Sequence, residues 1–255
     1  MSRLIFAANW KMHHGPATAG PLVREVLSRW RPQPGREVIF FPPALSLPAV
    51  VAALHDAGRR DAAAGVQNVY WEPKGAFTGE ISAPLAGEAG AAWALVGHSE
   101  RRHKFGETDE ETGRKVRAVL AAGVAPMLCV GELLDERKAG RTEEVVLRQL
   151  AAGLAGLDAA ATARVAIAYE PVWAIGTGVN ATPADAAAVH RSIRRWLVER
   201  SPKAASPTIL YGGSVNPGNA AALLAEQELD GVLVGGASLE AEGWITILSA
   251  PRPDR

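Results

Sequence analysis

One carboxylate stands where an apolar run gives way to a glycine-containing segment. Glu170 ends the run 165–170 and is followed by Pro171. Because a residue before proline is disfavoured in the helical region, Glu170 is expected at the extended end of a strand. Gly176 and Gly178 give the following segment backbone freedom. We interpret Glu170 as a base at the mouth of a site, with a lid attached. The alternative is a solvated carboxylate before an ordinary loop.

Two further groups suited to proton chemistry also follow apolar runs. Lys11 comes two residues after Asn9 and could face an anionic substrate. His98 precedes Ser99, and a helix beginning at Ser99 would lower the pKa of the imidazole and keep it neutral. A neutral imidazole can donate a hydrogen bond to a carbonyl oxygen. Glu100 could pair with Lys11 or carry a second proton. The alternatives are a solvated lysine and a structural histidine.

Glycine pairs follow the last two apolar runs. These are Gly212-Gly213-Ser214 and Gly235-Gly236. Glycines let backbone N–H groups approach an oxyanion closely, and a helix N-terminus adds partial positive charge. A single pair would be explained by turn geometry, but two pairs at corresponding places favour a phosphate site. We therefore predict a small phosphate ester as the substrate.

Short apolar runs alternate eight times with segments of helical period. The predicted strands are 4–9, 37–41, 61–65, 92–97, 125–130, 165–170, 208–211 and 231–235. Several of them lack in/out alternation, which is typical of strands covered on both faces.

The intervening segments carry helix signals. Thr182-Pro183 offers an N-cap and a proline in the first turn, and Thr142 is expected to cap another helix. With no linker or charge block, eight βα units predict an α/β protein with one (β/α)8 barrel domain over residues 1–255 and a frayed tail at 251–255. An open doubly wound sheet is disfavoured, because no Gly-x-Gly-x-x-Gly follows the first strand. In a barrel, all the residues above meet at one mouth.

Composition limits the partners. Lys plus Arg number 27, as do Asp plus Glu, so no net field attracts nucleic acid or an anionic membrane. The apolar run 4–8 is too short for a signal peptide, and no 18 uncharged apolar residues are consecutive. One cysteine fits a reducing compartment. We expect a cytoplasmic protein with no nucleic-acid or membrane partner.

Two further groups, a cysteine and a pair of histidines, are interpreted as structural rather than catalytic or metal-binding. Cys129 lies inside an apolar run and is predicted to be core rather than a nucleophile. His13-His14 could suggest a metal, but no carboxylate or cysteine stands at ligand spacing beside the pair, so we predict surface histidines and no metal site.

Taken together, these motifs make the chain resemble the triosephosphate isomerase family over nearly its whole length. The matching segments are Asn9 to Met12, Gln67-Asn68, Gly75 to Glu80, Val96 to Arg102, Cys129 to Glu132, Ala168 to Gly178, Tyr211 to Val215 and Val234 to Leu239. Each match is weak singly, but in this order they are specific. His13 departs from the pattern, which more often has Asn there.

The resemblance implies a TIM barrel that interconverts dihydroxyacetone phosphate and D-glyceraldehyde 3-phosphate in glycolysis and gluconeogenesis. It implies Glu170 as base, His98 as neutral electrophile, Lys11 as stabilising cation and Asn9 as an orienting group, with Ser99 and Glu100 in support. Phosphate would be held by Gly176, Ser214, Gly235 and Gly236. No metal or organic cofactor would be needed.

The segment 67–82 is too long for a simple βα connection and has little helical pattern. In the family such a loop reaches into a second subunit, which implies a homodimer with Thr78 near the partner's site. The competing functions are another phosphate-binding barrel isomerase or lyase, and an inactive barrel used as a binding protein. The presence of Lys11, His98 and Glu170 together disfavours both.

Overall fold

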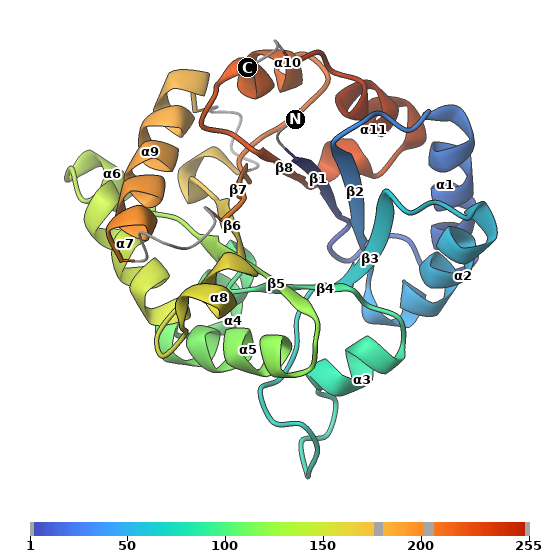
Figure 1. The fold of residues 1–255 in the computed structure, drawn as a ribbon, viewed down its shortest axis with the longest axis horizontal. Coiled ribbons are helices and arrows are strands. Elements are labelled where there is room, and N and C mark those ends of the chain that lie inside the picture. Colours follow the sequence, from blue (N-terminus) through green and yellow to red (C-terminus); the bar gives the residue numbers. More distant parts are fainter. Residues whose placement is uncertain (1–2, 176–180, 201–206, 253–255) are drawn as a thin grey trace.

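The centre of the molecule is a closed barrel of parallel strands, as predicted (Figure 1). The computed structural model describes residues 3–175, 181–200 and 207–252. Closure is direct, because β1 pairs with both β2 and β8. The strands are β1 (Leu4–Asn9), β2 (Arg36–Phe41), β3 (Ala62–Val66), β4 (Trp93–Val96), β5 (Ala125–Val130), β6 (Ala166–Tyr169), β7 (Ile209–Tyr211) and β8 (Gly231–Val234). Every boundary lies within one residue of the predicted range.

Helices surround the barrel as an outer ring (Figure 1). They are α1 (Pro16–Arg29), α2 (Leu47–Ala57), α3 (Ala83–Glu88), α4 (Ser99–Phe105), α5 (Asp109–Ala121), α6 (Leu134–Lys138), α7 (Thr142–Gly153), α8 (Ala159–Ala163), α9 (Pro183–Arg200), α10 (Ala220–Ala225) and α11 (Ala241–Leu248). Short 3-10 turns lie at η1 (Ala44–Ser46), η2 (Val172–Ala174) and η3 (Gly236–Ser238).

Two apolar clusters build the core. One lies between the strands and the helices, and a smaller one fills the inside of the barrel. Phe41, Leu95, Met127 and Cys129 belong to the inner cluster. Strands covered on both faces need apolar side chains on both, which explains the missing alternation. Cys129 is core, as predicted, and burial raises the pKa of its thiol well above the ordinary value.

Helix capping matches the prediction at one position and differs at another. At the start of α9, the Asp185 N–H donates to Thr182 Oγ1 over 3.1 Å, and the Thr182 N–H donates to Asp185 Oδ2 over 3.1 Å. At α7 the predicted cap is wrong, because Thr142 is the first helical residue and Arg141 precedes it without a side-chain capping bond. The turn 139–141 hydrogen-bonds back to α6, which moves the helix start by one residue.

The connection between β3 and α3 projects away from the ring (Figure 1). Residues 72–80 are all exposed, and a bridge between Tyr70 and Ser82 closes the base of the projection. At the other end of the chain, the Arg252 side chain donates to the Leu229 carbonyl, and residues 253–255 lie outside the described part.

Candidate active site

The predicted site residues gather at the carboxyl end of the barrel. Asn9 ends β1, His98 follows β4, Glu170 follows β6, and the glycine pairs follow β7 and β8. They surround a cavity of about 360 Å³. Its lining includes Asn9, Lys11, His98, Glu170, Gly212, Gly213, Ser214, Gly235 and Gly236. Ser99 and Glu100 begin α4 directly after His98 and are not part of this lining, whereas Thr78 lies on the projecting loop. Gly176 lies outside the described residues.

Glu170 is held by backbone at its base and by two partners at its carboxylate. Its N–H donates to the Val130 carbonyl over 2.8 Å, so β5 fixes where the strand ends. Oε2 accepts the Ser99 backbone N–H over 2.8 Å, and Oε1 lies 3.0 Å from His98 Nε2. The side chain is 2% exposed. A buried carboxylate is thereby satisfied by a helix N-terminus and an imidazole.

The contacts of His98 define its tautomer. The Glu100 backbone N–H donates to Nδ1 over 3.2 Å, so Nδ1 is an acceptor and the ring proton sits on Nε2, facing Glu170. Burial lowers the pKa of His98, but the charge of Glu170 and the hydrogen bond to it raise this pKa by more, so the net direction is upward. The expected lowering is therefore outweighed while the carboxylate faces the ring.

Lys11 is held in an unusual backbone conformation. Its φ is 50°, in the left-handed region that non-glycine residues rarely adopt. The Lys11 N–H donates to Asn9 Oδ1 over 3.0 Å, and Gln67 Nε2 donates to the Lys11 carbonyl over 2.7 Å. Nζ lies 3.2 Å from Glu100 Oε1, the pairing that the sequence suggested. Burial acts to raise the pKa of Glu100, but the nearby cations, Lys11 foremost, bring it below its ordinary value.

The loops after β7 and β8 present backbone donors to the cavity. The described part of the chain offers no acceptor to the N–H groups of Ser214, Gly235 or Gly236. Backbone N–H groups that line a cavity and have no acceptor among the described residues suit an oxyanion. Gly235 also leaves room for Lys11, because a Cβ there would lie 3.3 Å from Lys11 Cε. The same loops therefore expose donors and admit the cation.

Sequence reasoning missed a buried network behind Glu170. The Glu132 carboxylate is fully buried and accepts hydrogen bonds from Tyr169 Oη over 3.1 Å and from Trp173 Nε1 over 2.8 Å. Arg137 Nη1 lies 3.9 Å from Glu132 Oε1. The position of Glu132 just after β5, within a family-like motif, was the available signal. The hydrogen-bond partners of Glu132 lie on other elements, so no local sequence pattern could predict them.

The described residues contain no cluster of three or more His, Cys, Asp or Glu side chains suited to a metal. His14 instead bonds the Leu239 carbonyl through Nε2 over 2.9 Å. In the described ranges no helix is both long and apolar enough to cross a membrane.

The closed barrel and the polar residues around its carboxyl end define a (β/α)8-barrel enzyme. The family model described as Triosephosphate isomerase matches residues 4–251. The chain belongs to this family. Three similar proteins are each called triosephosphate isomerase. That of Syntrophotalea carbinolica is 46% identical and covers 97% of this chain and 98% of its own. That of Roseiflexus castenholzii is 48% identical, with 96% of each covered, and that of Solibacter usitatus is 43% identical, with 98% and 100% covered.

Proposed function

We propose that the chain interconverts dihydroxyacetone phosphate and D-glyceraldehyde 3-phosphate through an enediolate, in glycolysis and gluconeogenesis. The observation that carries this is the Glu170 carboxylate 3.0 Å from His98 Nε2 on a cavity that Ser214, Gly235 and Gly236 also line. In the described part of the chain, the N–H groups of these three residues have no acceptor. A base, a hydrogen-bond donor and an anion site then share one cavity.

In this mechanism Glu170 removes a proton from the carbon next to the carbonyl and returns it to the neighbouring carbon. Both of its oxygens are now engaged, so the carboxylate turns from the Ser99 N–H into the cavity to act. The His98 Nε2–H then becomes available to the substrate oxygen. Once the carboxylate leaves the ring, the main cause raising the pKa of His98 is gone, and burial keeps the imidazole neutral.

The remaining residues stabilise charge and orientation. Lys11 also lines the cavity, and its Nζ offsets the negative charge that develops on the enediolate oxygens. Asn9 orients these oxygens and also holds the backbone of Lys11. Glu100 keeps Lys11 extended over the mouth, and Ser99 provides the resting partner of Glu170. The phosphate is assigned to the N–H groups of Ser214, Gly235 and Gly236.

The test is conversion of D-glyceraldehyde 3-phosphate by wild type and by Glu170→Gln. Loss of the base is expected to lower kcat by about 10²- to 10⁴-fold. Glu143→Gln, which removes a carboxylate on α7 outside the mouth, is the matched control and should leave kcat unchanged. An inactive wild type, or full activity in Glu170→Gln, contradicts the proposal.

We also propose that two copies form a homodimer in the cytoplasm. In support, a second hollow of about 470 Å³ lies on the other side of Lys11 from the cavity. Met12, on its rim, is 94% exposed, and Phe105 is 67% exposed. The projecting loop that carries Thr78 is exposed along residues 72–80. A loop from a second copy inserted in this hollow would cover apolar groups on both chains.

A further inference from the structure

The guanidinium of Arg137, on α6, meets three groups from three different segments. It lies over the Trp173 ring at 4.3 Å from the centroid. Its Nη1 lies 3.9 Å from Glu132 Oε1, and its Nη2 donates to Asp185 Oδ1 over 2.9 Å. Trp173 comes three residues after Glu170, and Asp185 is in the first turn of α9. The Arg137 side chain thus connects the segment that follows β6 to the start of α9.

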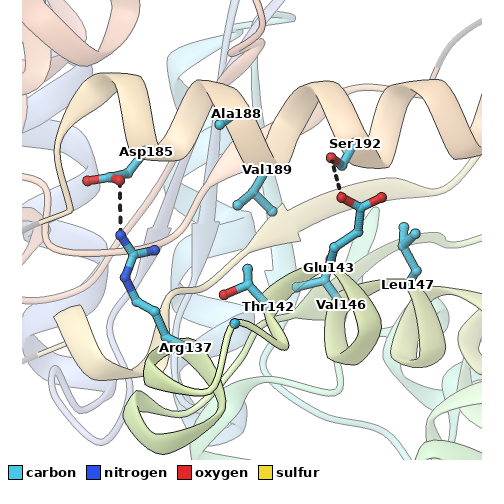
Figure 2. Close-up of a pocket in the computed structure, with 10 residues that line it drawn as sticks. Arg137, Thr142, Glu143, Val146, Leu147, Asp185, Ala188, Val189 and Ser192 are labelled. Atoms are coloured by element: carbon cyan, nitrogen blue, oxygen red, sulfur yellow. Dashed lines mark hydrogen bonds and ion pairs between the residues drawn. The ribbon is translucent and has the colours of Figure 1, made fainter.

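The contact to Asp185 crosses a gap between helices. A cavity of about 280 Å³ separates α6 and α7 from α9, with Val146, Leu147 and Val189 on its apolar walls. Figure 2 shows the Arg137 side chain reaching across it to Asp185, and Glu143 reaching Ser192 further along. Across this space, the ion pair between Arg137 and Asp185 ties the start of α9 to α6.

The path from Arg137 to the base is short. Trp173 is fixed from two sides, by its indole N–H on Glu132 and by the guanidinium over its ring. The turn η2 that contains it follows Pro171 directly, and the Val172 N–H donates to the Glu132 carbonyl over 3.1 Å. Any shift of Trp173 is therefore transmitted to the backbone next to Glu170.

We propose that Arg137 is a positioning residue that sets the place of Glu170 by bridging Trp173 and Asp185. The inference rests on the proposed function, since it concerns the same base. Arg137 touches no part of the cavity around Glu170, so it does not bind substrate. Its removal should slow proton transfer, which depends on sub-ångström placement, without weakening phosphate binding.

The test compares Arg137→Met with Arg195→Met. Arg195 also pairs with a carboxylate across the same gap, Glu143 at 3.0 Å, but this pair does not involve Trp173. We expect Arg137→Met to lower kcat on the order of tenfold with KM changed less than about twofold. Arg195→Met should retain both. The Arg137–Asp185 and Arg195–Glu143 pairs are both partly exposed, so the loss of either pair should by itself lower Tm by less than about 4 °C.

Hydrogen exchange gives a second measurement that needs no activity. The amides of 172–175, and those of residues 181, 182, 184 and 185, should exchange faster in Arg137→Met than in Arg195→Met. Equal kcat in the two variants, or equal exchange in both segments, overturns the inference. If Arg137→Met does not fold, Arg137→Lys carries the test: lysine keeps the charge but lacks the planar fork, and a wild-type kcat in it also overturns the inference. An inactive wild type would instead contradict the proposed function, and the exchange comparison would still decide the bridge.

Discussion

His190, on α9, is a buried imidazole with one satisfied nitrogen. Its residue exposure is 0%, and Nδ1 lies 3.3 Å from the Glu228 carbonyl, which places the proton on Nδ1. Within the described residues, Nε2 has no hydrogen-bond partner. Protonation would therefore bury a charge without an acceptor. Burial lowers the pKa of His190 from 6.5 to about 4.

This lowered pKa predicts a loss of stability in mild acid. Above pH 6.5 the imidazole is neutral in both the folded and unfolded states and contributes nothing. Between pH 6.5 and 4 only the unfolded state gains the proton, so the free energy of unfolding falls by up to about 1.4 kcal/mol per pH unit, or about 3 kcal/mol in all. Urea unfolding at several pH values measures the slope.

His190→Gln is the comparison variant because it does not titrate. Its free energy of unfolding should depend less steeply on pH between 6.5 and 4 than that of wild type, whatever its stability at pH 7. Parallel curves for the two proteins would show that His190 does not cause the acid sensitivity.

At the scale of single residues, residue type and position in the sequence predicted the candidate catalytic side chains better than the residues that hold them in place. Glu170, His98 and Lys11 each follow an apolar run, and parallel strands bring such positions to one mouth. Gln67 was noticed only as part of a motif, although it fixes the carbonyl of Lys11. The rise in the pKa of His98 depends on the Glu170 side chain, 72 residues away, which no local pattern could supply.

At the scale of the elements, the chain just after β5 passes very close to the chain just after β6. A Cβ built on Gly131 would lie 1.7 Å from the Glu170 carbonyl oxygen, so only glycine fits there. The space behind Glu170 is also limited at Gly212, where a Cβ would lie 2.8 Å from Glu170 Cγ. The glycine after β5 and the glycine after β7 together confine the base.

Gly131→Ala should therefore displace Glu170 and strain the barrel. We expect a loss of about 1–3 kcal/mol or more in the free energy of unfolding, together with a lower kcat. Gly15→Ala is the control: its φ is −65°, nothing lies within 4 Å of a Cβ there, and at a helix N-cap it should cost at most about 1 kcal/mol. Chemical denaturation and isomerase assays on both variants provide the check, and a Gly131→Ala protein as stable and active as wild type would contradict it.

The elements themselves were largely predictable because their signals are local. Apolar runs predicted all eight strands to within one residue. Several of these runs lack alternation, as strands buried on both faces require. The failed cap at Thr142 has a different cause. The three residues after α6 form a turn whose N–H groups donate to the carbonyls of Asp135, Glu136 and Arg137. This turn, rather than the threonine, decides where α7 begins.

For the whole molecule, the exposed apolar surface around the mouth favours association. Met12, beside the proposed site, is 94% exposed, and Phe77, on the projecting loop, is 40% exposed. Burying such groups stabilises an assembly by roughly 25 cal/mol for each Å² of apolar surface covered. We therefore expect a dimer that buries this apolar surface to be more stable than two monomers that leave it in water.

Light scattering should therefore give about twice the chain mass of 26.8 kDa at micromolar concentration. Met12→Glu places a charge in the expected contact and should raise the monomer fraction, because an unpaired charge is costly to bury. Val198→Glu makes the same change at a side chain on α9 that is 51% exposed, and it should leave the mass unchanged. If wild type is monomeric at this concentration, or both variants behave alike, the surface around Met12 is not the contact, and Thr78 belongs to a loop that serves its own chain alone.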